Sequence, residues 1–271
     1  MEVDDSVAFE RLVSVVEANR ATVAVVFPAV GAVLMVASQR FDHVLLEAAR
    51  ESTVGLVLAN AVMALPLALA VLPAVDSRAL LGLGVVSVLA YVFESVGVAT
   101  GVPYGDFSYL QEMGPMAFGV PVALPLFWVP ILLNGYLLSL RYVRPHVGRA
   151  GFVVAAVGFV VGLDGVLDPG AVALGFWGWN EPGVYYGVPL VNYLGWILSG
   201  SMGVAVLAVS FDDGALDERV RGFAPAFDTL VAFLVFWGLV ALFHGLWLPL
   251  LGAAALGVLL LSTEEGRYLP T

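Results

Sequence analysis

Residues 151–203 decide the fold, and they read GFVVAAVGFVVGLDGVLDPG at 151–170, AVALGFWGWNEPGVYYGVP at 171–189 and LVNYLGWILSGSMG at 190–203. The first and last pieces are predicted apolar helices, and the piece between them is aromatic and rich in glycine. Asp164 and Asp168 are four residues apart, so they share one face of the first helix. Carboxyl groups inside an apolar span are costly in lipid and mark a functional site by default. This stretch therefore predicts membrane helices that carry chemistry.

The composition of the whole chain assigns the class. Apolar residues make up 61% of the 271 residues and charged residues 12%, and the mean hydropathy is +0.96, which indicates a polytopic all-α integral membrane helix bundle. The chain has no cysteine, which excludes disulfides and thiolate metal sites. All eleven basic residues are arginine, which excludes a retinal Schiff base on lysine. The net charge of −11 makes nucleic acid an improbable partner.

The apolar spans predict about eight transmembrane helices in a single transmembrane domain, 1–271. Each is near the length that a hydrocarbon core of about 30 Å requires: 22–38, 52–74, 79–100, 120–140, 150–168, 190–210, 226–243 and 246–262. The acidic, mixed segment 1–21 is expected to be an interfacial helix. Residues 243–245 alone separate the last two spans, so one long broken helix is the alternative there.

The arginines predict the orientation. With eight spans, nine arginines fall on the side of the N-terminus and two, Arg40 and Arg50, on the other side. Because arginines gather in cytoplasmic loops, we expect a multi-pass protein of the cell membrane with both termini in the cytoplasm. The aromatic loops 101–119 and 169–189 then lie outside.

An internal repeat is indicated within 79–210, the expected repeat-containing catalytic core. The tripeptide Gly-Val-Pro occurs at 119–121 and again at 187–189, and in both copies Trp follows the proline by seven residues and Gly follows the Trp by seven. The repeat is parallel, with helices three and four matching five and six, and the preceding helices carry Glu94 and Asp164. Chance recurrence in a chain rich in Gly and Val is the alternative. Interfaces between repeats are common ligand sites in membrane proteins.

Three carboxyl groups are the candidate catalytic residues. Glu94 and Asp164 interrupt apolar helices, and we interpret both as buried acids, although a carboxylate that reaches interfacial water is the plain alternative. Asp168 precedes Pro169 at an expected helix end, where a local turn role is as good an explanation as a site.

Aromatic residues gather on the same side as these acids. An interfacial aromatic belt would explain any single ring, but their concentration favours a pocket in which ring faces stabilise a cation. The substrate-binding candidates are Tyr104, Asp106, Trp128, Trp177, Trp179, Tyr186, Asn192 and Trp196.

No cofactor or metal is expected. The three histidines are far apart or on different sides, and no nucleophile-elbow, Walker or dinucleotide motif is present. The DxxxD pattern at 164–168 partly matches a Mg²⁺-diphosphate motif, but the outer loops beside it contain no Arg or Lys. A membrane prenyltransferase or elongase therefore remains only an alternative.

Four runs resemble the carotenoid biosynthesis membrane protein family, whose members include carotenoid hydratases: GVPYGDFSY at 101–109, GVPVALPLFW at 119–128, LDGVLDP at 163–169 and GFWGWNEPGVYYGVPLVNYLGW at 175–196. The resemblance covers roughly 85–205. It implies addition of water across terminal C=C bonds of an acyclic carotenoid, giving tertiary hydroxyl groups. The lysine-free, acidic composition fits a halophilic archaeal source.

Residue roles follow from that chemistry as hypotheses. Asp164 is the expected proton donor, as a carboxyl group that burial keeps neutral, and Glu94 or Asp168 is expected to orient the water. The rings expected to face the cation are Tyr104, Trp177, Trp179 and Trp196, and Asn192 is expected to hold the water or the product hydroxyl. The lipophilic carotenoid would enter from the bilayer, and association with other membrane enzymes of the pathway is possible. A non-catalytic carotenoid carrier or transporter is a second alternative.

Overall fold

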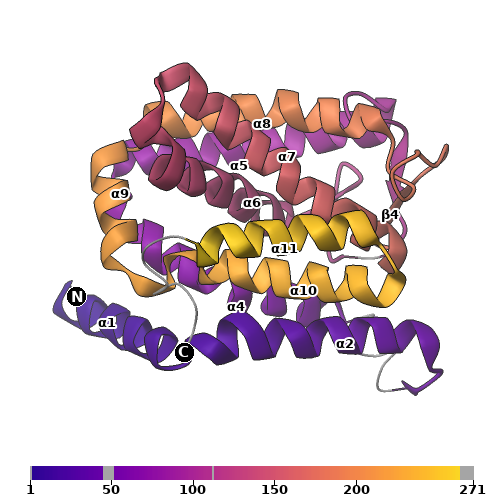
Figure 1. Cartoon of the computed structure of the whole chain (residues 1–271), viewed down its shortest axis with the longest axis horizontal. Helices are drawn as coiled ribbons and strands as arrows, with labels where there is room; N and C mark the ends of the chain where they lie inside the picture. Colours follow the sequence, from indigo (N-terminus) through magenta and orange to yellow (C-terminus); the bar gives the residue numbers. More distant parts are fainter. Residues whose placement is uncertain (1, 45–51, 112, 263–271) are drawn as a thin grey trace.

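Helices make up most of the chain that the computed structural model describes, which is residues 2–44, 52–111 and 113–262 (Figure 1). The protein is an all-α membrane helix bundle, as predicted. Its helices are α1 (Glu2–Ala18), η1 (Thr22–Val26), α2 (Phe27–Arg40), α4 (Thr53–Val71), η2 (Leu72–Ala74), α5 (Ser77–Thr100), α6 (Leu124–Leu138), η3 (Ser139–Val143), η4 (Arg144–His146), α7 (Arg149–Leu174), α8 (Leu190–Ser210), α9 (Asp213–Gly222), η5 (Ala224–Phe227), α10 (Asp228–His244) and α11 (Trp247–Leu261).

Seven helical stretches among the described residues are long and apolar enough to cross a membrane. The eighth predicted span is α11, an apolar helix of 15 residues, and at 1.5 Å per residue it extends about 22 Å. Gly245, with φ +69°, ends α10, and α11 turns back to pack along α10 (Figure 1). The last two spans are therefore separate helices.

Ordinary capping signals set several helix ends. The Ser52 hydroxyl accepts a hydrogen bond from the Gly55 amide at 3.1 Å, and Asp76 accepts one from the Ala79 amide at 2.7 Å. At the opposite ends, α5 and α7 both stop at a glycine in the left-handed conformation, Gly101 and Gly175, each with φ +74°.

Helix α7 continues past Pro169, so the expectation that Asp168 lies at a helix end was wrong. A proline inside a helix leaves the carbonyl four residues earlier without its amide partner. Here that carbonyl belongs to Gly165, and the Tyr185 hydroxyl donates a hydrogen bond to it at 3.1 Å. The replacement bond explains how the helix tolerates Pro169 and keeps Asp168 inside its wall.

Helix α6 also contains a proline, and a side chain again supplies the missing hydrogen bond. Pro130 frees the carbonyl of Leu126, and the Asn60 side chain of α4 donates to it at 2.7 Å. A side chain from another element thus supplies the missing donor in both helices.

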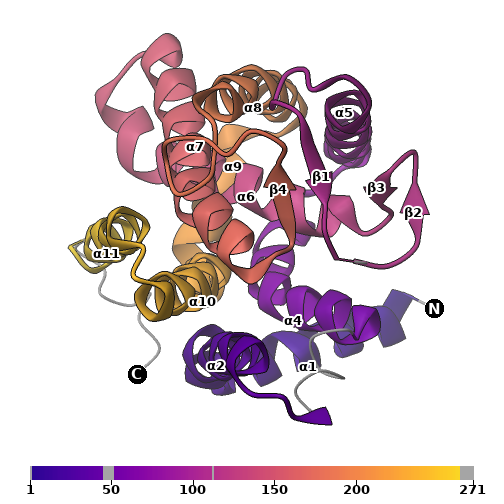
Figure 2. The same cartoon turned by 90° about the vertical axis from the view of Figure 1, so that its right-hand side faces the viewer.

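Short strands close one end of the bundle, which we call the aromatic end (Figure 2). Strand β1 (Phe107–Tyr109) pairs antiparallel with β4 (Trp177–Trp179), with Ser108 opposite Gly178. Strands β2 (Met116–Ala117) and β3 (Val120–Pro121) form a small hairpin. The β1–β4 pair joins two loops that are far apart in the sequence.

The two Gly-Val-Pro segments have the same backbone conformation. Phe118 and Gly119 have φ values of 53° and 79°, and Tyr186 and Gly187 have 52° and 90°. Residues 117 and 120 pair across the first turn, and residues 185 and 188 across the second. Two left-handed residues between paired flanks are typical of a type I′ hairpin. This matching geometry supports the repeat.

Helix packing supports it further. Helix α5 packs on α8 and α6 packs on α7, so each half contacts the other in an equivalent way. The rings of Trp128 and Trp196, the repeated tryptophans, stack with centroids 5.7 Å apart and planes 18° apart. Counting back seven residues from Gly101 and from Gly175 pairs Glu94 with Asp168, rather than with Asp164 as the sequence pattern had suggested.

The other end of the bundle is rich in arginine, and we call it the arginine end. Helix α9 lies there (Figure 1), and the described arginines at the helix ends around it are Arg20, Arg78, Arg141, Arg144, Arg149, Arg219 and Arg221. Arg20 also forms a double hydrogen bond with buried Asp228, at 2.8 and 2.7 Å. Arg40, at the end of α2, lies at the aromatic end.

Candidate active site

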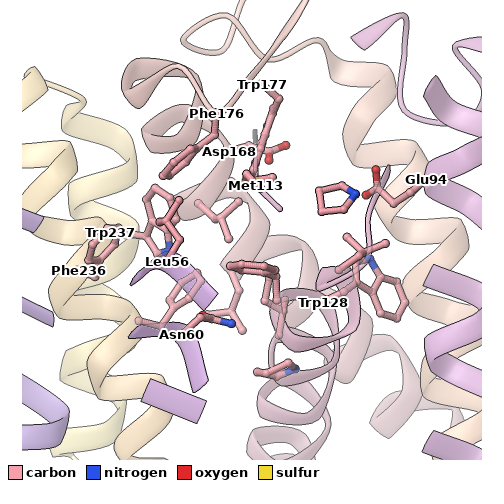
Figure 3. A pocket seen from close by; sticks show the side chains of 18 of the residues that line it. Leu56, Asn60, Glu94, Met113, Trp128, Asp168, Phe176, Trp177, Phe236 and Trp237 are labelled. Carbon is pink, nitrogen blue, oxygen red and sulfur yellow. The ribbon is translucent and has the colours of Figure 1, made fainter. Parts of the chain in front are cut away.

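A cavity of about 200 Å³ lies beneath the β1–β4 pair, between α4, α5, α6, α7, α8 and α10 (Figure 3). Its lining is mostly aromatic and aliphatic, with a few polar groups, the usual character of a site for an apolar ligand. The predicted site residues that line it are Glu94, Tyr104, Trp128, Asp168, Trp177, Trp179, Asn192 and Trp196. Eight of the predicted site residues thus converge on one cavity.

Three predicted site residues do not line it. Asp164 lies behind the wall and is fully buried, with 0% exposure. Asp106 is exposed and accepts a hydrogen bond from the Asn180 side chain at 2.7 Å, so it holds the loop. Tyr186 is a turn residue whose hydroxyl accepts a bond from the Leu248 amide at 3.3 Å.

Two carboxyl groups enter the cavity from different helices. Asp168 of α7 is 3% exposed and Glu94 of α5 is 9% exposed, and Figure 3 shows them on different walls of the cavity. Each lies seven residues before the left-handed glycine that caps its helix, about 10 Å along the axis. Both acids are therefore at the same depth, near the aromatic end.

One asparagine, Asn192, connects Asp168 to Asp164. The Asn192 amide nitrogen donates to an oxygen of Asp164 at 3.2 Å and also to an oxygen of Asp168. The two carboxyl groups interact directly with each other as well. Carboxyl groups this close are expected to share a proton. The network places Asp168 at the cavity and Asp164 one layer behind it.

Two tyrosines lie near Glu94, and one of them bonds to it. Tyr109 of β1 donates to a Glu94 oxygen at 3.2 Å. Burial, and then the charge of Glu94, raise the pKa of Tyr109 well above its ordinary value; burial followed by the charge of Glu94 also raises the pKa of Tyr104. Both phenols stay protonated at neutral pH, so Tyr109 is a permanent donor that orients the Glu94 carboxyl group.

Aromatic rings form part of the cavity wall. Tyr104 packs 6.2 Å from Trp196, ring centre to ring centre, and the Trp179 indole donates to the Tyr104 carbonyl at 2.9 Å. Two glycines make room for the Tyr104 ring, because a Cβ atom would lie 3.1 Å from it at Gly97 and 2.5 Å at Gly195. The loop tyrosine is thereby fixed between α5 and α8.

The sequence did not predict the part of the cavity wall that comes from α4 and α10, because these helices lie outside 79–210. It also did not predict two polar lining residues, Asn60 and Asn134. The lining residues missed include Asn60, Asn134, Phe176, Phe233, Phe236 and Trp237. Asn60 and Asn134 carried a signal, since each is a polar residue inside an apolar span. The aromatic residues of α10 carried none, because rings in an apolar helix are ordinary.

The described cavity lining contains no Arg or His, and no group of three His, Cys, Asp or Glu among the described residues is arranged to hold a metal ion. The residues present are donors and acceptors for neutral groups. A diphosphate would meet no cationic partner on this described lining.

Comparisons with known proteins show the family of this chain. The family model described as carotenoid biosynthesis protein matches residues 52–260. A curated relative from Haloarcula japonica, named bisanhydrobacterioruberin hydratase, is 41% identical over 264 residues, covering 97% of this chain and 88% of the relative. No solved structure matches. The chain belongs to the carotenoid biosynthesis protein family.

Proposed function

We propose that this protein is a carotenoid hydratase that adds water across terminal C=C bonds of an acyclic carotenoid. The observation that carries the proposal is a pair of buried carboxyl groups, Asp168 and Glu94, on separate helices around one aromatic cavity. The name of the Haloarcula japonica relative supports the same reaction, with bisanhydrobacterioruberin as the corresponding substrate.

Asp168 is the proposed proton donor. In its protonated form it transfers a proton to the less substituted carbon of the alkene, so that the π electrons form the new C–H bond and a tertiary cation remains. Asp164 was the donor expected from the sequence, but Asp168 lines the cavity whereas Asp164 does not. Asn192 holds both carboxyl groups in place.

The aromatic wall stabilises the cation. The π faces of Trp128 and Trp196 and the Tyr104 ring surround the space between the acids, and ring faces attract positive charge in a desolvated site. The apolar lining excludes most other nucleophiles.

Glu94 is the proposed base. As a carboxylate it accepts a proton from a water molecule while the water oxygen bonds to the cationic carbon. The sum of the two steps is the addition of one water, because the proton given by Asp168 is balanced by the one that Glu94 takes up. Tyr109 orients Glu94 for this step.

The membrane supplies the substrate in this proposal. One face of α4, including Leu56, Asn60 and Met63, lines the cavity, and residues 53–65 of α4 include no buried residue. We infer that a polyene enters from the lipid along this face. The arginine end would lie in the cytoplasm, and the acids would lie near the outer interface, where water is available.

Expression in a host that makes the unhydrated acyclic carotenoid tests this function. We expect mass spectrometry of the extracted pigments to show a gain of one or more waters, unchanged when divalent cations are chelated. A gain of isoprene units would replace the proposal with a prenyltransferase. Unchanged pigment that copurifies with the protein would replace it with a carrier.

A further inference from the structure

A second polar region lies behind the cavity, between α7, α8 and the hairpin 183–188. Two polar atoms there are buried without a hydrogen-bond partner among the described residues, one carboxyl oxygen of Asp164 and the hydroxyl of Tyr193. The other carboxyl oxygen of Asp164 accepts from Asn192. The first carboxyl oxygen therefore has no hydrogen bond to Asn192 or to any other described group.

Several contacts locate Tyr193 next to Asp164. Its ring packs against Tyr185, with centroids 5.8 Å apart, and the Tyr185 hydroxyl bonds to the carbonyl of Gly165, the residue after Asp164. The charged neighbours that act on the Tyr193 hydroxyl are Asp164 first and Asp168 second. The two unpartnered groups thus belong to one compartment.

An ordered water would supply the hydrogen bonds that the Asp164 oxygen and the Tyr193 hydroxyl lack. Buried polar atoms are almost always paired with protein or with water, because an unpaired one loses its hydration without compensation. A tyrosine hydroxyl can donate to a water, and that water can donate to the carboxyl oxygen. The hairpin beside them leads outward, since Tyr185 is only half-buried and its neighbour Val184 is 89% exposed.

We propose that Tyr193 and Asp164 form a proton relay that recharges Asp168 from the solvent at the aromatic end. This inference rests on the proposed hydratase function. After each turnover Asp168 is a carboxylate, while its own face of the cavity is filled by an apolar chain. Asp164 passes its proton to Asp168, then takes one from the water held by Tyr193. The water is in turn recharged from the solvent. Because Glu94 releases one proton to the solvent in each turnover, no net proton is consumed.

In this scheme Asp164 and Tyr193 are positioning and relay residues that never touch the carotenoid. Their loss should slow proton return without changing how the substrate binds. Infrared spectroscopy gives a direct readout, because the C=O band of a protonated carboxyl group shifts when its proton is replaced by deuterium. Purified full-length protein in lipid nanodiscs, transferred to D₂O, shows how fast this replacement occurs.

We expect Tyr193→Phe to slow the exchange of the carboxyl band at least tenfold. Its kcat for hydration should fall about tenfold with an unchanged KM for the carotenoid. Tyr136→Phe is the matched control, because Tyr136 is a buried tyrosine that bonds to Asp213 at the arginine end. The control should exchange at the wild-type rate. Asp164→Asn removes the carboxyl group of the relay. In this variant the carboxyl band of Asp168 should exchange slowly.

Wild-type exchange in both Tyr193→Phe and Asp164→Asn would overturn the relay. A higher Tm in Tyr193→Phe together with wild-type exchange would also overturn it, because that pair of results marks a hydroxyl that holds no water. If Tyr193→Phe does not fold, Asp164→Asn alone decides. The exchange rate does not depend on hydration, so failure of the hydratase function would appear separately, as absence of water addition by the wild-type protein.

Discussion

The two halves of the central bundle have the same plan and different chemistry. The first unit is 77–138 and the second is 149–210; each has a long helix that ends at a left-handed glycine, a type I′ turn and a helix with the repeated tryptophan. At the position of Asp164 the first unit has Ala90, and at the position of Asn192 it has Leu124. Only the acids Glu94 and Asp168 correspond.

This difference supports different catalytic roles for the two carboxyl groups in the proposed mechanism. The second unit surrounds its cavity acid with an amide and another acid, an arrangement that can hold and return a proton. The first unit gives its acid a single phenol donor, Tyr109, which in the proposed mechanism orients the base. Two similar units thus present two carboxyl groups at equal depth, and we propose that their different neighbours give them different roles.

The largest expected effect is that of removing the second unit's acid. Asp168→Asn should lower hydration at least 100-fold, because general acid catalysis by a positioned group contributes about 10²–10⁴ in rate. Mass spectrometry of extracted carotenoids measures the loss. Asp106→Asn, an exposed change at the same end of the bundle, should leave activity near wild type. Full activity in Asp168→Asn would remove the proposed donor.

The first unit's acid should matter less. Glu94→Gln still accepts the Tyr109 hydrogen bond but cannot take a proton from water, so we expect hydration to fall about 100-fold, the low end of the range for a general base. Tyr109→Phe should cost only several-fold, since the base remains. Initial rates with purified enzyme compare the three proteins. The division of roles is wrong if Tyr109→Phe is as inactive as Glu94→Gln.

Making the second unit resemble the first tests the network. Asn192→Leu removes the donor shared by Asp164 and Asp168 and should lower the free energy of unfolding by about 2 kcal/mol, since buried acceptors lose their partner. Thermal unfolding in detergent gives the comparison. Asn180→Leu, which removes an exposed donor to Asp106, should change stability by less than about 0.5 kcal/mol. Equal effects of the two substitutions would contradict the network.

The smallest effect concerns Pro169, the proline inside the long helix of the second unit. Tyr185→Phe leaves the Gly165 carbonyl without its donor and should cost about 1 kcal/mol. In a Pro169→Ala background the helix regains its own amide donor for that carbonyl, so the same change should cost less than half as much. A double-mutant cycle by thermal unfolding measures the coupling. Strictly additive effects would show that the tyrosine does not replace the lost bond.

Much of this molecule could be predicted from its sequence. Apolar run length determines membrane helices, and eight of the residues predicted for the site line the cavity. The path of α7 through Pro169 could not be predicted, because it depends on a hydroxyl sixteen residues further along the chain. Likewise, Asp164 and Asp168 share a helix face, and only packing against Asn192 and α10 decides which one meets the cavity. The residues that α4 and α10 add to the cavity wall could not be predicted either, because only tertiary packing brings these helices to the cavity.

The equal depth of Glu94 and Asp168 has a kinetic consequence. In the proposed mechanism the chemistry takes place at one end of the bundle, so a carotenoid with two identical ends would react at only one of them during each encounter. The hydratase is then distributive: the half-converted molecule returns to the bilayer, reverses its direction and competes with fresh substrate. A time course would show this asymmetric pigment rising first and the fully hydrated one following after a lag, with the lag set by lipid dynamics as much as by catalysis.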